Sequence, residues 1–385
     1  MTDIFFTEDE KRFRQQVRTF AKDHVAPVVE EIETKQLYPR EIIEEMGRLG
    51  FLGVLHPREY SGTGKGLSYE IIVAEELSAV SASTEMSRLA SATLYAMPIN
   101  RFGTHTQKER FLTPIVKGEK IGALCITEPT VGSDTAGMKS TALRKDSAYV
   151  LNGEKRFITN GSVADLLVVF AITNPSVHPH EGMSALIVES SMPGFQVFKE
   201  HDLLGMRGAK VAHLKFRDLE VPIENLLGKE DEGFKVLMDE LDSERVAVAA
   251  GMIGTARSAF ETAAKYSTER VQFDQPIRKF EGVSFKIADM ATKLEASRLL
   301  VLQAARMIDS GLVATKEAAM AKLHSTETAV EISNEALQVL GGIGYTKEYP
   351  VERYLRDTRL MTIGAGTSEI MRYLIQREIY REIRK

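Results

Sequence analysis

The stretch GFKVLMDELDSERVAVAAGM, residues 233–252, decides the fold of this chain. Its apolar side chains recur at steps of three, four and seven residues, which predicts a helix with one buried face: Phe234, Leu237, Leu241, Val248 and Met252. A step of three from Leu241 reaches Glu244. A carboxylate therefore stands where the pattern requires an apolar side chain.

Glu244 has two interpretations. An unpaired carboxylate on a packed face costs several kcal/mol of desolvation, so an ordinary core position seldom holds one. Burial also raises the pKa of a carboxyl group, which suits a general base that works near neutral pH. Alternatively, Glu244 lies at the edge of the apolar stripe and pairs with Arg245 or with a lysine from another element. Periodicity alone leaves both interpretations open.

The composition is that of a soluble globular enzyme. Hydrophobic residues make up 43% and charged residues 27% of the chain, a composition too apolar for a disordered protein. Its 385 residues are enough for two or three domains. The net charge of -5 gives no basic surface for nucleic acid or anionic membrane. A single cysteine, Cys125, excludes an internal disulfide framework. Since no apolar run is long enough for membrane insertion and no apolar signal segment opens the chain, we expect a cytoplasmic protein.

Three regions of different pattern predict three domains and an α+β fold. Residues 1–120 indicate an N-terminal helical domain, which opens with a capping box of Thr7 and Glu10. Residues 121–232 hold short β-rich runs, with Asn152 and Gly153 as a hairpin signal. The spacing of these runs leaves no room for crossover helices, so we expect an antiparallel barrel or sandwich without a Rossmann nucleotide site. Residues 233–385 indicate a four-helix bundle whose longest helix spans 315–340.

Three other features have ordinary explanations. The loop SGTGKG at 61–66 lacks the spacing of a phosphate-binding loop. His178 and His180 have no other ligand at metal-binding spacing, so no metal site is predicted. Arg88 is interpreted as solvated or salt-bridged. If it instead faced a substrate pocket, it would suit an acyl chain that ends in a carboxylate.

Five motifs together resemble those of the flavin-dependent acyl-CoA dehydrogenases. They are TEPTVGSD (127–134), NGEKRFITN (152–160), ERVQF (269–273), QVLGGIGY (338–345) and GTSEI (366–370). The resemblance covers nearly the whole chain in order. It implies the fold of that family, with FAD as cofactor and an acyl-CoA as substrate.

The resemblance also implies two groups of FAD-binding residues. The first would pack on the flavin ring and hydrogen-bond it: Thr127, Gly132, Ser133, Phe157 and Thr159. Phe157 stands where many relatives have tryptophan, and its aromatic face preserves the packing. The second would hold the pyrophosphate and adenosine, much of it from a neighbouring subunit: Arg270, Phe273, Gln338, Gly342, Thr367 and Glu369. A site shared between subunits implies an obligate oligomer, typically a homotetramer in this family.

The position of the catalytic base departs from the commonest family pattern. Many members carry a glutamate directly before the Gly-Thr of the last motif, where this chain has Ala365, preceded by Gly364. The branch that includes isovaleryl-CoA and long-chain acyl-CoA dehydrogenases supplies the base from the helix that here carries Glu244. The resemblance and the periodicity therefore both indicate Glu244 as the base.

The implied reaction is α,β-dehydrogenation of an acyl-CoA thioester. Glu244 would take the α-proton, and the β-hydrogen would leave as hydride to the flavin. The thioester oxygen would be stabilised by the backbone N–H of Ala365 and a ribityl hydroxyl of FAD. Ser133, Asp242, Arg245 and Gly364 would complete the substrate-binding set, and Arg245 could equally orient Glu244.

Substrate and electron acceptor follow from the same resemblance. The small side chains at 364 and 365 favour a short branched or cyclic acyl group, and an electron-transfer flavoprotein is the expected acceptor. Three alternatives stay open: a flavin enzyme of the same fold with non-dehydrogenase chemistry, a dehydrogenase for ω-carboxylated acyl-CoA, and an acyl-CoA-binding oligomer without flavin.

Overall fold

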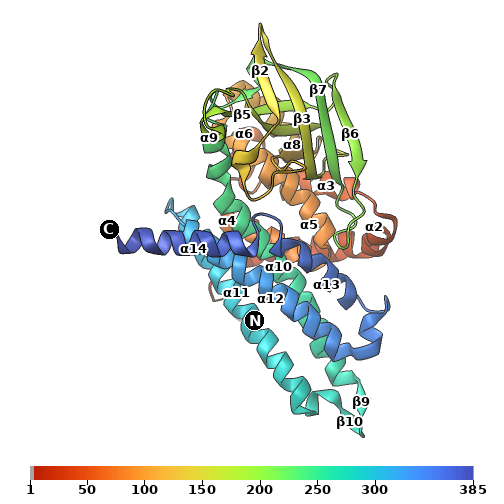
Figure 1. The fold of residues 1–385 in the computed structure, drawn as a ribbon. Coiled ribbons are helices and arrows are strands. Elements are labelled where there is room, and N and C mark those ends of the chain that lie inside the picture. The colour runs from red at the N-terminus through yellow and green to blue at the C-terminus, as the bar shows by residue number, and fades with distance from the viewer. Residues whose placement is uncertain (1–3, 385) are drawn as a thin grey trace.

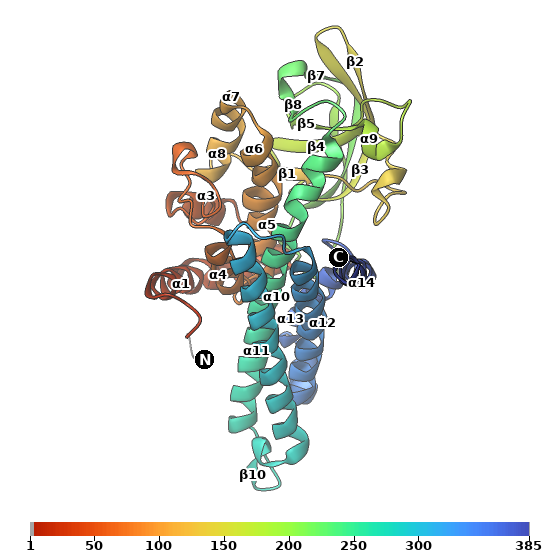
Figure 2. The same cartoon turned by 90° about the vertical axis from the view of Figure 1, so that its left-hand side faces the viewer.

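The computed structural model describes residues 4–384, which run from N-terminal helices through a β-sheet into long C-terminal helices (Figure 1). The α+β fold expected from the sequence is confirmed. The sheet occupies one end of the molecule, and the long helices extend to the other end (Figure 2). None of the helices within the described residues is both long and apolar enough to cross a membrane.

The N-terminal region is helical, as predicted. Its first helix begins at the expected capping box, because the Thr7 side chain accepts a hydrogen bond from the Glu10 N–H while the Glu10 carboxylate accepts one from the Thr7 N–H. A π-helical stretch, Ala90–Tyr95, joins the fifth and sixth helices. The helices are α1 (Glu8–Phe20), α2 (Val29–Lys35), α3 (Arg40–Arg48), α4 (Leu67–Ser78), α5 (Ala82–Leu89), α6 (Ala96–Phe102), α7 (His105–Gln107) and α8 (Thr113–Val116).

The middle region forms one sheet that is mainly antiparallel, with strand order β6-β7-β3-β2-β4-β5-β8. Two pairings differ from the expected antiparallel pattern, because β1 and β2 each pair with β4 in parallel. Strand β4 is buried on both faces, because alternate side chains enter two different cores, which explains its unbroken apolar sequence. The elements are β1 (Gly122–Cys125), β2 (Thr141–Lys145), β3 (Ala148–Thr159), β4 (Leu166–Ile172), α9 (Pro179–Gly182), β5 (Met183–Glu189), β6 (Phe195–Glu200), β7 (Val211–Pro222) and β8 (Leu226–Leu227).

The hairpin predicted at Asn152 and Gly153 is wrong. Both residues lie inside β3, where the register against β7 shifts. The Asn152 side chain bonds the Asp218 backbone N–H across this irregularity at 2.9 Å. A Cβ at Gly153 would lie 2.3 Å from the Ser140 Oγ, so only glycine fits there. The pair therefore serves a β-bulge, and the β2–β3 turn falls instead at residues 146–147, where Asp146 has a φ of +52°.

The C-terminal region consists of long helices. The prediction that 315–340 forms the longest helix is wrong, although its bounds are correct: α12 has 26 residues and α10 has 37. Beyond Met252, α10 continues through small residues that carry little periodic signal. A Cβ at Gly254 would lie 2.1 Å from the Glu75 carbonyl oxygen, so α10 packs closely on α4 there. The elements are α10 (Gly233–Glu269), β9 (Val271–Gln272), β10 (Gln275–Pro276), α11 (Glu281–Asp309), α12 (Thr315–Leu340), α13 (Val351–Arg359) and α14 (Ser368–Ile383).

The N-terminal and C-terminal helices share one hydrophobic core. The same buried cluster contains Phe13 of α1, Ile72 of α4, Ile253 of α10 and Ile332 of α12. The sheet contributes two smaller cores, one of which also includes residues of α6 and α10. The two helical regions therefore share a core, whereas the middle region also has one of its own. The domain boundaries stay a prediction.

Candidate active site

Glu244 lies on the buried face of α10 and is only 9% exposed. Burial raises the pKa of its carboxyl group above the ordinary value, while Arg245 and Lys322 act in the opposite direction. Both cations bind other groups, because Arg245 donates to Asp242 and Lys322 donates to the Gly366 carbonyl. The ion pair with Arg245 that the sequence left open is therefore not formed. Glu244 is a buried carboxyl group near two positive charges that are bound elsewhere.

Asp242 and Arg245 form the pair expected from their spacing. The Arg245 Nη1 donates to the Asp242 Oδ1 at 2.9 Å, and the Thr315 hydroxyl donates to the Asp242 Oδ2 at 2.6 Å. These bonds fix α10 against the start of α12. The Arg245 Nε is buried and has no acceptor among residues 4–384. Arg245 therefore keeps an N–H that an anionic or carbonyl ligand could use.

Lys322 of α12 completes the charged cluster, and the sequence analysis missed it. Its side chain is fully buried, which lowers its pKa to about 8, while Glu244 acts against this. Its Nζ donates to the Gly366 carbonyl at 2.6 Å, which ties α12 to the turn at 364–367. Lys322 lies seven residues before Ala329 on the apolar stripe of α12. The reasoning applied to Glu244 would have found it.

Glu240 was also missed. It lies one turn before Glu244, is 2% exposed, and neither of its carboxyl oxygens has a hydrogen-bond partner among the described residues. Burial raises the pKa of Glu240 well above its ordinary value, and Glu244 adds to this effect. Two buried carboxyl groups therefore occupy successive turns of α10. The sequence pattern could have identified Glu240, because it follows Leu237 of the apolar stripe by three residues.

The turn at 364–367 carries two of the predicted substrate-binding residues. Ala365 has a φ of +53° and Gly366 a φ of +87°, so two successive residues adopt the left-handed conformation. None of the described residues accepts a hydrogen bond from the Ala365 N–H. This donor is therefore available to a ligand oxygen.

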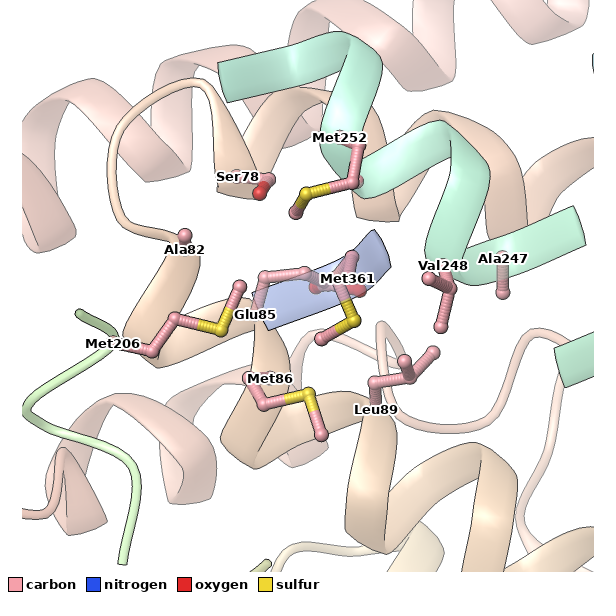
Figure 3. A pocket seen from close by; sticks show the side chains of 11 residues that line it. Ser78, Ala82, Glu85, Met86, Leu89, Met206, Ala247, Val248, Met252 and Met361 are labelled. Carbon is pink, nitrogen blue, oxygen red and sulfur yellow. The ribbon is translucent and has the colours of Figure 1, made fainter. Parts of the chain in front are cut away.

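A small, mainly apolar pocket lies between α4, α5 and α10 (Figure 3). Its lining on α10 begins three residues after Glu244 and follows the same helical face. Met361 also lines it, with its Sδ 3.8 Å from the position of a Cβ on Gly364. The pocket therefore adjoins both Glu244 and the turn. The lining residues are Ser78, Ala82, Glu85, Met86, Leu89, Met206, Ala247, Val248, Gly251, Met252 and Met361.

The residues predicted to contact the flavin ring lie at the C-terminal end of β3 and in the loop that begins beside it. The Arg156 N–H donates to the Thr127 carbonyl at 2.8 Å, which places Thr127 beside the strand that carries Phe157 and Thr159. Phe157 is 55% exposed and has a φ of +59°. A large exposed ring beside hydroxyl groups fits the face of a planar aromatic cofactor. Gly132 and Ser133 lie in the exposed loop after Thr127, and a Cβ at Gly132 would meet open space.

Four of the residues predicted to hold the rest of FAD lie far from this group. Arg270 and Phe273 follow the end of α10, and Gln338 and Gly342 lie at the end of α12, at the tip of the bundle remote from the sheet (Figure 1). Phe273 is 88% exposed. From Glu244 to Glu269, helix α10 rises through 25 residues (269 − 244), or about 38 Å. The tip of the bundle is therefore remote from the end of α10 that carries Glu244.

Thr367 and Glu369 occupy a third place, the start of α14. Thr367 caps this helix by accepting a hydrogen bond from the Ile370 N–H. Glu369 is exposed, and hydrogen bonds from its own N–H and the Thr367 hydroxyl lower its pKa. Both residues lie beside the turn at 364–367.

Arg88 is fully buried and forms ion pairs with Glu70 and Glu85, which confirms the salt-bridged interpretation. Its Nε and Nη2 each donate to Glu85 at 2.8 Å, and its Nη1 and Nη2 donate to Glu70. The guanidinium is therefore already shared by two carboxylates. It is not available to the carboxylate of a substrate.

Comparison with known proteins gives the same family along the whole chain. The models for the N-terminal, middle and C-terminal domains of acyl-CoA dehydrogenases match residues 7–119, 123–219 and 231–380. The short-chain-specific acyl-CoA dehydrogenase of Clostridium acetobutylicum is 41% identical over 98% of this chain and 100% of its own. The mitochondrial isovaleryl-CoA dehydrogenase of Solanum tuberosum is 40% identical over 99% and 93%. A chain from a structure described as the electron transferring flavoprotein of Acidaminococcus fermentans is 43% identical, with a TM-score of 0.96 over 99% and 100%.

Proposed function

Because this chain belongs to the acyl-CoA dehydrogenase family, we propose that it dehydrogenates a short branched or cyclic acyl-CoA with Glu244 as the catalytic base. The family consists of FAD-dependent oxidoreductases that act on CH–CH donors. The proposal concerns what the family leaves open, namely the base, the acyl group, the electron acceptor and the assembly.

The position of Glu244 carries the proposal. Ala365 stands at the position where many family members have their catalytic glutamate. Glu244 is a buried carboxyl group on α10, and the residues of α10 that line the pocket follow it on the same helical face. Burial raises the pKa of Glu244, which brings a carboxyl group closer to the strength that proton abstraction needs. The positive charges of Arg245 and Lys322 act against this rise in the pKa of Glu244. Glu244 would remove the α-proton of a thioester whose acyl chain enters the pocket.

The Ala365 N–H would stabilise the negative charge that develops on the thioester oxygen. Its donor has no partner among the described residues, and a donor of this kind is worth about 3 kcal/mol in the transition state. Lys322 holds the turn in place through the Gly366 carbonyl. When bound, FAD supplies the acceptor for the hydride from the β-carbon. The exposed ring of Phe157 with Thr127, Gly132, Ser133 and Thr159 would hold its flavin.

A homotetramer would complete the FAD site. The proposal is supported by the position of four predicted FAD-binding residues at the remote tip of the bundle, about 38 Å along α10 from Glu244, and by the exposure of Phe273 there. A neighbouring subunit would bring Arg270, Phe273, Gln338 and Gly342 to the cofactor. The proposed electron acceptor is an electron-transfer flavoprotein, which the description of the Acidaminococcus fermentans structure supports.

The pocket lining supports a short branched or cyclic acyl group. Four methionines line it, and their flexible side chains adapt to irregular shapes. Gly364 and Ala365 leave room beside the thioester. A carboxylate at the end of the acyl chain is disfavoured, because Arg88 is shared by Glu70 and Glu85 and because Glu85 itself lines the pocket.

The test is an anaerobic titration of the purified flavin enzyme with straight, branched, cyclic and ω-carboxylated acyl-CoAs, followed by flavin absorbance. Rapid bleaching by branched or cyclic substrates is expected, with little bleaching by the ω-carboxylated one. A yellow protein that none of these substrates bleaches would refute dehydrogenation of this substrate class and favour the non-dehydrogenase alternative. Titration of the reduced enzyme with an electron-transfer flavoprotein, and sedimentation of the holoenzyme, test the acceptor and the tetramer.

A further inference from the structure

One side chain in the pocket wall is ionisable. Among the described lining residues, Glu85 carries a carboxyl group, whereas the others are methionines, small aliphatic residues, a leucine, a valine, a glycine and a serine. Glu85 is 4% exposed, and its side chain extends into the pocket among the methionines (Figure 3). A carboxyl group in such a wall is costly unless a polar partner is bound there.

Glu85 lies at the end of the pocket away from the base. Its Cγ is 3.8 Å from the position of a Cβ on Gly251. Gly251 follows Glu244 by seven residues on the same face of α10 (251 − 244), which corresponds to about 10 Å along the helix. An acyl group with its α-carbon at Glu244 would therefore bring its distal atoms toward Glu85.

The cluster around Glu85 has one cation for two carboxylates. Arg88 donates two hydrogen bonds to Glu85 and two to Glu70, and the Thr93 hydroxyl donates to Glu70 at 2.9 Å. His56 does not add a charge, because burial lowers its pKa and its Nε2 is bonded to the Ala92 carbonyl. Each Glu85 oxygen receives one bond from Arg88, and a carboxylate oxygen can accept two. Glu85 therefore retains acceptor capacity.

These observations distinguish between classes of acyl group. A methyl-ended chain would cover Glu85 without using its remaining acceptor capacity, and its two oxygens would keep only their bonds from Arg88. A carboxylate-ended chain would place a like charge against it. A hydroxyl or ammonium group would donate a hydrogen bond, and an ammonium would also supply the missing positive charge.

We propose that Glu85 is a specificity-determining residue that selects acyl-CoAs with an O–H or N–H donor at the distal end of the acyl group. The inference rests on the proposed function, because it assumes that this pocket receives the acyl chain. It refines the substrate class to short acyl groups that bear a hydroxyl or an ammonium.

The test uses four acyl-CoAs of matched length with the FAD holoenzyme: ω-hydroxypentanoyl-CoA, ω-aminopentanoyl-CoA, hexanoyl-CoA and glutaryl-CoA. The measured quantity is kcat/KM for anaerobic flavin reduction. At least one donor-ended substrate should exceed hexanoyl-CoA by about tenfold or more, and glutaryl-CoA should be the poorest. The better of the two donor-ended substrates identifies the donor as hydroxyl or ammonium.

Two variants separate recognition from folding. Glu85→Leu leaves Arg88 paired with Glu70 and should reverse the preference in favour of hexanoyl-CoA. Glu85→Gln keeps an acceptor oxygen without the charge, so it should lose preference for the ammonium and retain activity with the hydroxyl. If kcat/KM of the wild-type enzyme for hexanoyl-CoA equals or exceeds that for both donor-ended substrates, the inference about Glu85 is wrong, whereas the proposed function is not affected. Isovaleryl-CoA is assayed alongside the four matched substrates, and failure of all five acyl-CoAs to reduce the flavin would overturn the proposed function as well.

Discussion

Replacement of Glu244 by glutamine removes the proposed base with almost no change in shape. General-base catalysis contributes about 10²- to 10⁴-fold, which corresponds to about 3 to 5 kcal/mol of transition-state stabilisation. The upper part of this range is expected, because Glu244 is only 9% exposed and solvent cannot easily replace it. The assay is exchange of the α-proton of a bound acyl-CoA for deuterium, together with the rate of flavin reduction. Binding of the acyl-CoA itself should change little.

The matched control is Glu240→Gln, one turn earlier on α10. This change also removes a buried carboxyl group, yet it should keep most of the exchange. In the wild-type enzyme, activity should rise with pH as Glu244 loses its proton, over a range above the ordinary pKa of a glutamate because burial raises the pKa. The Glu244→Gln variant should lose this dependence. Exchange at the wild-type rate in Glu244→Gln, or an equal loss in both variants, would refute the assignment of the base.

Three further changes test the structure. The raised pKa of Glu240 means that the folded state binds this proton more tightly than the unfolded state, so its contribution to stability is lost as pH rises above about 4.3, the unfolded value. Glu240→Gln should therefore raise the free energy of unfolding more at pH 8 than at pH 5, and an equal difference in urea unfolding at both values would contradict this. Burial alone would raise the pKa of Glu75, but Arg298, Arg257 and Arg14 lower it well below its ordinary value. Glu75 therefore stabilises the folded state above about pH 4.3, and this contribution is lost as pH falls. Glu75→Gln should cost about 3 to 5 kcal/mol at pH 7 and reduce the sensitivity of unfolding to acid; unchanged urea midpoints would argue against the network. Phe157→Ala should weaken FAD binding by roughly 2- to 10-fold, the effect of one aromatic contact, with little change in unfolding of the apoprotein because the ring is 55% exposed; unchanged FAD retention during dialysis would place the flavin elsewhere.

Much of the fold follows from local signals in the sequence. The capping box fixed the start of α1, because the side chain and backbone that form it are three residues apart. The glycine pair after Leu340 fixed the end of α12, whose predicted bounds are those of the structure. The apolar stripe of α10 placed Glu244 on a buried face. Each of these depends on residues within a few turns of one another.

Local signals failed where a distant segment decides the conformation. Asn152 and Gly153 have the composition of a hairpin turn, but β7 approaches them from residues 211–222 and makes them a bulge. Helix α10 extends beyond its apolar stripe, and there Gly254 lets α4 pack closely against its backbone. Neither contact leaves a periodic trace in the sequence.

The sequence by itself determined the order of the elements, the family resemblance and the carboxyl group that interrupts the stripe of α10. Only the tertiary structure decided what surrounds that group: Lys322 from α12, Arg245 bound to Asp242, and a pocket lined by Glu85. Behind that wall, Glu85 shares Arg88 with Glu70. The reason is physical. A periodic pattern shows which face of a helix is buried, but the charge, pKa and available hydrogen bonds on that face depend on elements that arrive from elsewhere in the chain.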